Sequence, residues 1–479
     1  MILLLPILVY FFICLHILMS QGRSPMAVIS ARTALLEGGW AHDVRVEIDA
    51  SGKIVSVLSD QNPEGHKTGI LLPAPANVHS HAFQRAMAGL TERKGPDPSD
   101  SFWTWRQLMF RFLDRLTPDH VEGIAAFVQM EMLEAGYAAN VEFHYLHHQP
   151  GGSAYDKLSE MSDRIVAAAA HTGIGLTLLP VHYEYGGCDG RPLGQGQIRF
   201  GNDFERFAKL HDQARQTMQY LPSDSRLGVA PHSLRAVAAR DLKSASDLAG
   251  DGPLHMHLSE QQAEVDEVLA FHGARPISFF LDQCDAGPQW CLIHCIQMNS
   301  AESDQLARSG AVAGICPVTE ASLGDGIFGA TAWLGAGGAL AIGSDSNIRI
   351  SLTEELRALE YSQRLRDHSR ASLATHDRST GRRLFEAVNK GGAQASGRNS
   401  ACISEGRLAD LVAIDDGHVD LAGRTGDALL DSYIFAGDDS LVTDVWSAGR
   451  HMVRQGQHIA HDAIVSRYRS IMHELGDAL

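Results

Sequence analysis

The long middle of the chain, residues 76–395, alternates short apolar runs with longer amphipathic stretches, and this alternation restricts the fold more than any other feature. Two of the longer stretches, 117–137 and 159–173, are typical of helices. Eight strand–helix units in roughly 300 residues predict a closed (β/α)₈ barrel. The runs expected to form its strands are LLPAPANVHSH, AANVEFHYLHH, GIGLTLLPVHYEY, RLGVAPHSLRA, PLHMHLSEQ, QWCLIHCIQM, AVAGICPVTEASLGDG and ALAIGSDSN.

Both ends of the chain have a different pattern. Residues 27–75, 406–416 and 442–459 consist of short runs in which apolar and polar residues alternate, with turns between them, as in β-strands. We therefore expect one small sheet domain built from both chain ends, at 26–75 and 398–470, and a barrel at 76–397. The predicted fold class is α/β, a TIM-like (β/α)₈ barrel with a small β-sheet domain.

The first 19 residues, MILLLPILVYFFICLHILM, are almost wholly apolar and are about as long as the ~20 residues that a membrane-spanning helix needs. No lysine or arginine precedes this run and no clear small-residue cleavage site follows it, so it lacks the pattern of a secretory signal. We interpret residues 1–25 as an artefactual or dispensable extension ahead of a plausible start at Met26. A membrane anchor and an export signal are the alternatives. If no membrane segment is real, we expect a cytoplasmic protein.

Charge and cysteine content narrow the class of protein further. Forty basic and 57 acidic residues give a net charge of −17, and no basic stripe with interleaved aromatic residues occurs, so we expect no nucleic-acid partner. Seven irregularly spaced cysteines do not predict a disulfide framework and favour a reducing compartment. The composition, 44% hydrophobic and 20% charged, is typical of a soluble globular protein.

Polar residues follow the predicted strands at their carboxyl ends, where barrel enzymes carry their chemistry. Residues two apart in a strand point to the same face, so His79 and His81 would project together into the barrel mouth. A histidine pair of this spacing also arises by chance in a chain with 24 histidines, and the prediction depends on the joint pattern. Neutral imidazoles with one carboxylate suit Zn²⁺. The further candidates at later strand ends are His255, His257, His294 and Asp345.

This joint pattern resembles the amidohydrolase superfamily, whose members are metal-dependent barrels with a small β-sandwich made from both chain ends. The resemblance covers about residues 27–470. The strings HSHAFQRAMAGLTE, FWTWR, APHSLRAV, HMHLSEQ, CPVTEASLGDG and EELRALEYSQRL are similar to the formimidoylglutamate deiminase family. The resemblance implies a metal-dependent hydrolase with one Zn²⁺ per chain, because His232 stands where two-metal relatives have a bridging lysine. The metal ligands that it implies are His79, His81, His257 and Asp345.

The same resemblance assigns further roles in the site. The catalytic residues that it implies are Glu260, His294 and Asp345. The substrate-binding residues that it implies are Gln84, Arg106, Tyr145, His232 and Arg235. One departure is Asn347, which stands where the family often has another histidine.

The activity implied is the deimination of N-formimino-L-glutamate to N-formyl-L-glutamate and ammonia in histidine degradation. A metal-bound hydroxide would attack the formimino carbon, because Zn²⁺ lowers the pKa of bound water to around 7. The partner is then a small molecule with two carboxylates, and a homodimer is expected. The alternatives are another amidohydrolase, such as imidazolonepropionase or an aminoaryl or nucleobase deaminase, and a non-catalytic relative that serves as a binding scaffold.

Overall fold

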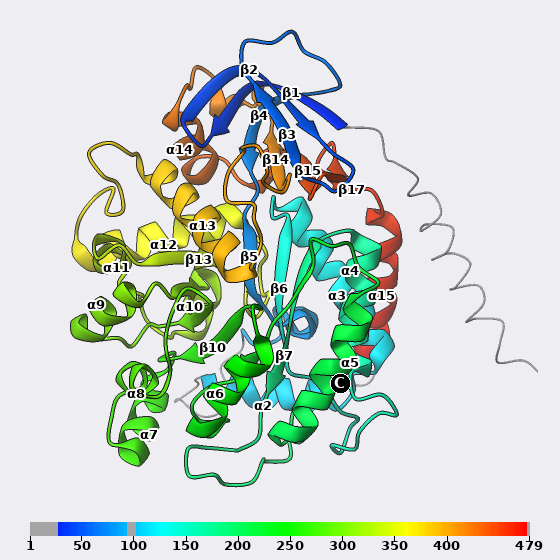
Figure 1. Cartoon of the computed structure of the whole chain (residues 1–479), viewed down its shortest axis with the longest axis vertical. Coiled ribbons are helices and arrows are strands. Elements are labelled where there is room, and N and C mark those ends of the chain that lie inside the picture. The colour runs from blue at the N-terminus through cyan, green and yellow to red at the C-terminus, as the bar shows by residue number, and fades with distance from the viewer. Residues whose placement is uncertain (1–26, 93–101, 477–479) are drawn as a thin grey trace, which may run out of the picture.

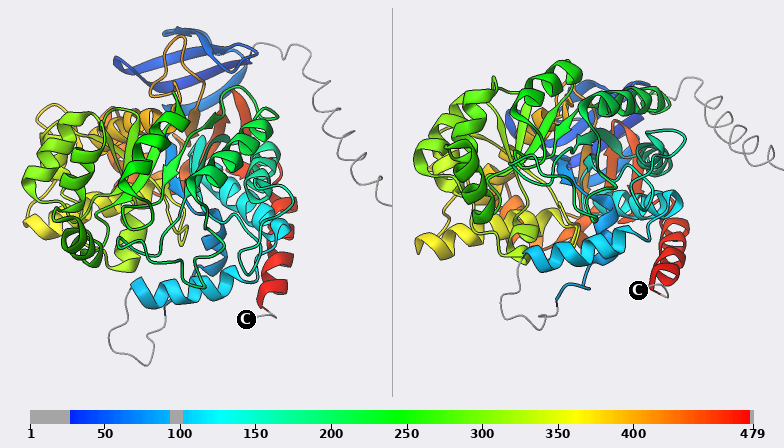
Figure 2. Two further views of the ribbon diagram at one scale, coloured as in Figure 1. Left: turned by 60° about the horizontal axis from the view of Figure 1, so that its bottom comes forward. Right: turned by 90° about the horizontal axis from the view of Figure 1, so that it is seen from below.

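The structure, a computed structural model, describes residues 27–92 and 102–476. A barrel of parallel strands makes up most of the molecule, and the blue N-terminal strands lie against one end of it together with orange and red strands from the C-terminal part (Figure 1). The two further views show the same arrangement, with a long C-terminal helix along the side of the barrel (Figure 2). This architecture confirms the predicted fold class.

Each of the eight predicted runs contains barrel strand. The strands are β5 (Ala76–Ser80), β6 (Ala139–His144), β7 (Gly175–His182), β8 (Arg226–Leu227) with β9 (Ala230–Pro231), β10 (Leu254–Leu258), β11 (Trp290–His294), β12 (Val312–Ile315) and β13 (Ala339–Ile342). Neighbouring strands within each part of the barrel pair in parallel. Strands of parallel barrels are covered on both faces, which explains why these segments are near-continuous apolar runs.

Helices follow the strands around the outside of the barrel. Their bounds are η1 (Ala82–Met87), α2 (Phe102–Leu113), α3 (Pro118–Glu134), α4 (Glu160–Thr172), α5 (Phe204–Met218), α6 (Ala239–Ala249), α7 (Gln262–His272), α8 (Pro276–Gln283), α9 (Ser300–Ser309), α10 (Pro317–Leu323), α11 (Ala330–Gly335), α12 (Leu352–Asp367) and α13 (Thr380–Ser396). Helices α3 and α4 match the two helices predicted at 117–137 and 159–173. At the start of α3, the Thr117 side chain caps the helix and Pro118 occupies its first turn.

The barrel closes through two isolated bridges. Val229 pairs with Leu254 between β9 and β10, and Ser80 pairs with Asp345 between the first and last strands. At the second bridge, the Asp345 N–H donates to the His79 carbonyl and the His81 N–H donates to the Asp345 carbonyl, at 2.9 and 3.0 Å. The closure therefore places the predicted histidine pair beside the predicted aspartate.

Both ends of the chain contribute to one eight-stranded sheet. Its strands are β1 (Ala27–Leu36), β2 (Gly39–Ile48), β3 (Ile54–Leu58), β4 (His66–Pro73), β14 (Leu411–Ile414), β15 (Val442–Ser447), β16 (Arg450–Arg454) and β17 (Gln457–His458), in the order β17-β16-β15-β14-β4-β1-β2-β3. A separate hydrophobic core contains Ile29 and Val44 from the N-terminal strands together with Leu411 and Trp446 from the C-terminal strands. This shared core is that of a β-sandwich.

The C-terminal region also contains helices. These are η2 (Val419–Leu421), α14 (Asp427–Phe435), η3 (Asp439–Leu441) and α15 (His461–Gly476). The last of them, drawn in red in Figure 1, packs along α3 of the barrel. The domain boundaries at 75/76 and 397/398 remain predictions.

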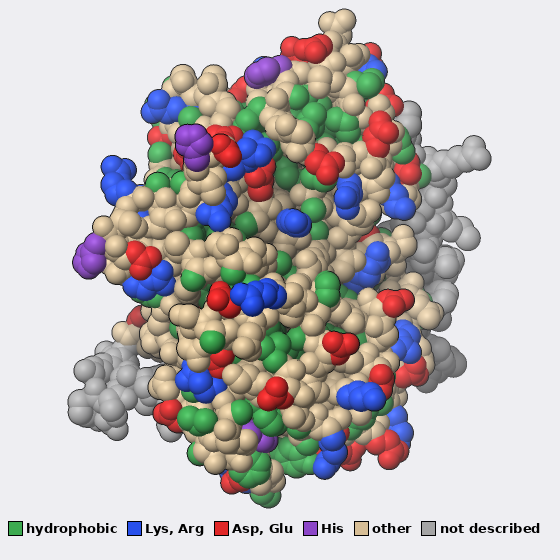
Figure 3. All heavy atoms as spheres, turned by 60° about the vertical axis from the view of Figure 1, so that its left-hand side comes forward, with side chains coloured by type: hydrophobic (Ala, Val, Ile, Leu, Met, Phe, Trp, Pro, Cys, Tyr) green, Lys and Arg blue, Asp and Glu red, His purple; other side chains and the backbone are tan. Residues whose placement is uncertain are grey.

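The apolar segment 1–25 lies outside the described residues. Within the described ranges, no helix is both long enough and apolar enough to span a membrane. The six cysteines in these ranges are free thiols. On the face drawn in Figure 3, basic and acidic side chains are interspersed, and the blue side chains form no continuous stripe.

A buried ion-pair network joins the barrel to the sandwich. The fully buried guanidinium of Arg398 donates to both carboxylate oxygens of Asp410, at 2.9 and 2.8 Å, and to Asp224 at 2.9 Å. Arg450 of β16 donates to the same Asp224 carboxylate at 2.7 and 2.8 Å. Asp224 precedes β8 of the barrel and Asp410 precedes β14, so the network ties the two parts of the molecule together.

Replacing Arg398 by methionine should destabilise the protein by about 3–5 kcal/mol, because it leaves the buried Asp410 carboxylate without its partner. Urea unfolding followed by circular dichroism would measure the shift. The matched control is Arg32→Met, which breaks a solvent-exposed ion pair with Asp416 and should move the unfolding midpoint little. Equal shifts for the two variants would contradict a special role for the buried network.

Candidate active site

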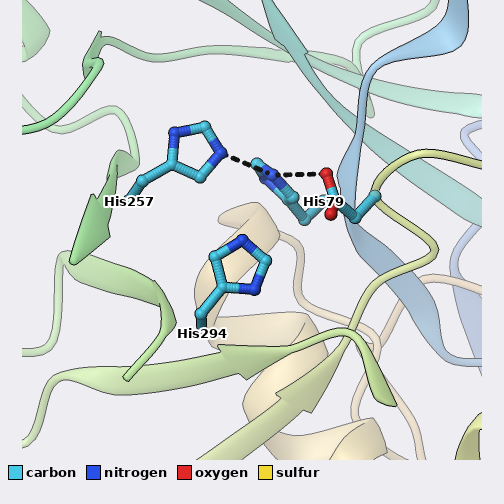
Figure 4. Close-up of side chains that lie close together, drawn as sticks. His79, His257 and His294 are labelled. Atoms are coloured by element: carbon cyan, nitrogen blue, oxygen red, sulfur yellow. Dashed lines mark hydrogen bonds and ion pairs between the residues drawn. The ribbon is translucent and has the colours of Figure 1, made fainter. Parts of the chain in front are cut away.

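Four side chains from four different strands meet at the barrel mouth. One possible ligand atom from each of His79, His257, His294 and Asp345 lies within 4.8 Å of every other, and all four residues are buried. The Nε2 atoms of His79 and His257 are 3.0 Å apart, and His79 Nε2 is 3.4 Å from Asp345 Oδ1. Figure 4 shows His257 and His294 pointing toward His79 from the opposite side. The cluster offers nitrogen and oxygen ligands to one metal ion.

The structure also brings His81 to this place, although not into the most compact group. Its Nε2 atom is 3.3 Å from Asp345 Oδ1, and its ring lies 4.6 Å from that of His79. The group of four therefore contains His294, whereas the predicted ligand set contains His81. His255, which shares a strand face with His257, takes no part in the cluster. Its Nε2 forms a hydrogen bond with the Ala395 carbonyl at 2.8 Å.

Hydrogen bonds behind the cluster set the orientation of two of the rings. His81 Nδ1 donates to the Phe143 carbonyl at 2.9 Å, and His257 Nδ1 donates to the His232 carbonyl at 3.1 Å. A neutral imidazole that donates from Nδ1 has a free electron pair on Nε2, and both Nε2 atoms face the cluster. This pattern is typical of metal-binding histidines, so the residues fit a divalent metal ion.

The protonation states agree with that fit. Burial lowers the pKa of His79 to about 3 and lowers the pKa of His81 and His257, so these rings are neutral. Burial would raise the pKa of Asp345, but its contacts with His79, His81 and His294 outweigh burial and hold the pKa below its usual value. Neutral imidazoles and an ionised carboxylate are the forms that bind zinc.

Unusual backbone conformations set the direction of the His294 and Asp345 side chains. His294 ends β11 with a φ of 72°, and Asp345 follows β13 with a φ of 46°. Non-glycine residues rarely adopt positive φ, and where they do so beside a pocket the conformation often serves the site. The positive φ turns each residue out of its strand direction at the mouth of the barrel.

A hydrogen-bonded chain of four buried side chains holds β5 to β13 beneath the cluster. Asn77 donates to Ser344 Oγ at 2.6 Å, and Ser344 donates to Asn347 Oδ1 at 2.6 Å. Asn347 in turn donates to Ser80 Oγ at 3.1 Å. Asn347, the departure from the family pattern, thus connects Ser80 with Ser344. Ser80 lies between His79 and His81, and Ser344 precedes Asp345.

A carboxyl group and an imidazole lie face to face beside the cluster. His294 Nε2 is 3.8 Å from Glu260 Oε1, and His294 Nδ1 is 3.2 Å from Glu320 Oε1. The Glu260 backbone N–H donates to Glu264 at 3.0 Å, which fixes the loop after β10. Burial raises the pKa of Glu260, although His294 acts in the opposite direction. Burial therefore favours the protonated form of Glu260 next to His294.

His294 has a second carboxylate partner that the sequence did not identify. Burial would lower the pKa of His294, but Glu260 and the hydrogen bond with Glu320 outweigh burial and raise it. Glu320 also accepts the Cys316 N–H at 2.8 Å, so its position is fixed from behind. The only sequence signal for Glu320 is its place in the string CPVTEASLGDG after the seventh barrel strand.

Three residues of the cluster, His257, His294 and Asp345, line one pocket together with all five predicted substrate-binding residues. Gln84 donates to the Tyr145 hydroxyl at 2.8 Å, and Arg106 donates to the Tyr183 hydroxyl at 2.9 Å. The pocket residues are His81, Gln84, Trp105, Arg106, Met109, Tyr145, Tyr183, Phe200, His232, Arg235, His257, Glu260, His294, Leu323 and Asp345.

Five of these pocket residues were not predicted. They are Trp105, Met109, Tyr183, Phe200 and Leu323. Trp105 lies in the string FWTWR, so its signal was present, whereas Phe200 comes from a loop without a recognisable pattern. The added side chains are mostly large and apolar, so they give the pocket apolar walls beside its polar groups.

Two arginine side chains place positive charge in this pocket. Arg106 comes from α2, and Arg235 follows β9. The Nε atom of Arg235 is buried and has no hydrogen-bond partner among the described residues. Burial would lower the pKa of Arg235, but Glu264 and Glu260 outweigh it and raise the pKa, so the group is a cation. Two guanidinium groups in one pocket favour an anionic ligand.

Family profiles match nearly the whole described chain. Residues 70–452 match the amidohydrolase family, and residues 26–67 match the N-terminal domain of formimidoylglutamate deiminase HutF. The junction between the two matches falls within β4, shortly before the first barrel strand.

Individual proteins agree with these matches. The chain is 46% identical over 456 residues to a formimidoylglutamate deiminase of Pseudomonas aeruginosa, covering 94% of this chain and 100% of that protein. A crystal structure of an amidohydrolase from Brucella melitensis has a TM-score of 0.90 and 45% identity, covering 94% of this chain and 99% of that one. A zinc complex of the atrazine chlorohydrolase TrzN from Arthrobacter aurescens has a TM-score of 0.81 at 20% identity, over 93% of this chain and 100% of that one, and so shares the fold.

Proposed function

The chain belongs to the amidohydrolase family and, within it, to the formimidoylglutamate deiminases, and from this premise we propose that it hydrolyses N-formimino-L-glutamate to N-formyl-L-glutamate and ammonia in histidine degradation. The observation that carries the proposal is one pocket in which a His/Asp cluster lies beside Arg106 and Arg235. The cluster is suited to hydrolysis at the formimino carbon. The arginines are suited to the two carboxylates of the glutamate half.

The proposed metal is one Zn²⁺ per chain, held by His79, His81, His257 and Asp345. When bound, a zinc ion lowers the pKa of a coordinated water and so supplies a nucleophile at neutral pH. The converging Nε2 atoms and the ionised carboxylate support this ligand set. A single ion is supported by the fourth strand, where the neutral side chain of His232 occupies the place of a bridging lysine.

The reacting groups of the chain have separate tasks. The ionised Asp345 carboxylate accepts a proton from the attacking water and orients it toward the formimino carbon. Glu260 carries a proton to the terminal nitrogen, which leaves as ammonia when its bond to that carbon breaks. His294 donates a hydrogen bond to the tetrahedral centre as negative charge develops there. The proton that Asp345 accepts and the second hydrogen of the water both reach the leaving nitrogen through Glu260. Water thus supplies the oxygen of the formyl product and two of the three hydrogens of ammonia, and the third is already on the terminal nitrogen of the substrate.

The substrate half of the pocket fixes orientation. Arg235 and Arg106 pair with the two carboxylates, and the hydrogen-bonded Gln84 and Tyr145 line the side nearer the metal ligands. His232 contributes twice, because its side chain lines the pocket and its carbonyl orients His257. A substrate bound in this way presents its formimino carbon to the cluster.

The test is release of ammonia from N-formimino-L-glutamate by the purified protein, with and without a chelator. We expect turnover that a chelator abolishes and that added Zn²⁺ restores, with about one metal ion per chain at full activity. Imidazolonepropionate and an aminopurine serve as comparison substrates. No ammonia from the formimino compound, or a higher kcat/KM on a ring compound, would overturn the proposal. Two ions per chain, with activity following the second, would overturn the single-ion assignment.

The homodimer and the cytoplasmic location remain predictions. Sedimentation of the purified protein would test the first, and cell fractionation would test the second. Membership of the deiminase family implies that the protein acts on a small molecule. That this molecule carries two carboxylates is part of the function proposed above.

A further inference from the structure

A second group of metal-binding side chains lies on the sandwich, away from the pocket. It consists of His66 of β4, Asp444 of β15 and His451 of β16, and one ligand atom of each lies within 4.8 Å of the others. His66 Nε2 is 3.1 Å from Asp444 Oδ1, and His451 Nε2 is 2.8 Å from the same oxygen. None of the three residues lines the catalytic pocket.

Packing holds this group in place. His451 is directly opposite Trp446 in the antiparallel pair of β15 and β16, and the two rings stack 4.5 Å apart at 20°. His66 contacts both rings, with centroids 5.4 Å from Trp446 and 4.8 Å from His451. Trp446 is itself buried in the sandwich core. The three metal-binding side chains therefore share one rigid aromatic support.

The group is open to solvent on one side only. The Asp444 side chain is 11% exposed and that of His451 17%, whereas that of His66 is 41% exposed. An ion could enter beside His66 and complete its coordination with water. The Asp444 carboxylate offsets one of the two charges of a divalent ion, and the solvent beside His66 hydrates the remainder.

The distances are close to those of a coordinated ion. Two ligand atoms that each lie about 2.0–2.1 Å from a tetrahedral ion are roughly 3.3 Å apart. The observed separations of 3.1 and 2.8 Å need to widen by only a few tenths of an ångström. Without metal, His451 donates its Nε2 proton to Asp444, and His66 Nε2 lies 3.1 Å from the same oxygen. With metal, each ring keeps its single proton on Nδ1 and binds through Nε2.

We propose that His66, Asp444 and His451 form a second binding site for a divalent transition-metal ion, separate from the catalytic pocket. Two imidazoles and one carboxylate select Zn²⁺, Ni²⁺ or Cu²⁺ over Mg²⁺ or Ca²⁺. With three protein ligands and one open side, the site binds more weakly than the buried cluster at the barrel mouth.

Trp446 gives this site its own optical signal. Ni²⁺ quenches the fluorescence of an indole that it approaches closely, so Ni²⁺ is titrated into the zinc-loaded, full-length enzyme while tryptophan emission and ammonia release are followed. We expect a saturable quench with about one Ni²⁺ bound per chain and unchanged ammonia release. Trp446→Phe should abolish the quench and keep the bound ion, as measured by equilibrium dialysis.

Two substitutions test the ligands. His66→Ala removes an exposed side chain, and His451→Gln is a second variant that keeps a polar side chain of similar reach. Each should abolish the saturable quench and the additional bound Ni²⁺. The matched control is His376→Ala, which removes an exposed histidine outside the group and should change neither.

The outcomes separate the possibilities. No additional Ni²⁺ in the unaltered enzyme would mean that the group is a hydrogen-bonded structural cluster only, and the proposal would fail. A quench that persists in both histidine variants would place the ion elsewhere and also overturn it. Loss of ammonia release in step with the quench would show that Ni²⁺ had entered the catalytic pocket instead. The quench and the count of bound Ni²⁺ do not depend on which substrate the enzyme prefers, and only the ammonia-release control rests on the proposed function.

Discussion

Replacing Glu260 by glutamine should lower kcat for ammonia release by about 10²–10⁴-fold, the usual contribution of a general acid–base group. The substitution keeps the size and hydrogen-bonding shape of the side chain but removes the proton that the leaving nitrogen must receive. Glu260 contributes no ligand to the proposed metal site, so zinc content should remain about one per chain. Steady-state kinetics and elemental analysis of the same preparation would measure both quantities.

A matched control separates this role from a general effect of losing negative charge. Glu205→Gln changes an exposed carboxylate of α5 and should leave kcat unchanged. If Glu260→Gln kept a kcat close to that of the unaltered enzyme, Glu260 would not be the proton carrier. If it lost zinc together with activity, its main role would be to maintain the metal site.

Replacing Arg106 or Arg235 by methionine should raise KM for N-formimino-L-glutamate by about 10- to 150-fold. This range corresponds to the roughly 1.5–3 kcal/mol of a charge-assisted hydrogen bond. The formimino group is small, so discrimination must come from the glutamate half, whose two carboxylates need cationic partners. Lysine at either position should restore binding only in part, because it lacks the planar guanidinium fork.

The decisive measurement is kcat/KM on N-formimino-L-glutamate and on a neutral formimino compound without carboxylates. The variants should lose far more on the charged compound than on the neutral one. Arg240→Met serves as the control, since it removes an exposed arginine of the neighbouring helix α6. Equal losses on both compounds would mean that the arginines maintain the pocket structure, and their role in substrate selection would have to be abandoned.

The barrel could be predicted because its strands are buried on both faces, so their sequences are nearly continuous runs of apolar residues. The same logic located His79, His81, His257, His294 and Asp345, since residues at strand ends can be identified once the strands are known. The choice between His255 and His257 could not be made from spacing alone. It depends on which ring reaches the cluster, and His255 instead bonds the carbonyl of Ala395.

Other features of the site depend on contacts that no local pattern shows. Glu320 supports His294 only because α10 lies beside the end of β11. Positive φ is uncommon for any residue other than glycine, and although His and Asp adopt it more often than most, their sequence positions do not predict it at His294 and Asp345. Pocket residues such as Phe200 come from long connections whose course is set by the folded barrel.

The closure between β5 and β13 also has a consequence for how the protein is made. The residues that join these strands, Asn77 and Ser344, are 267 positions apart, and His79 and Asp345 lie immediately beside them. A ribosome synthesises the histidine pair early, but the carboxylate that completes its surroundings emerges only when most of the polypeptide has been translated. Binding of the proposed metal ion at full affinity is therefore expected late in biogenesis, and a prematurely terminated polypeptide ending before residue 345 should hold the ion poorly.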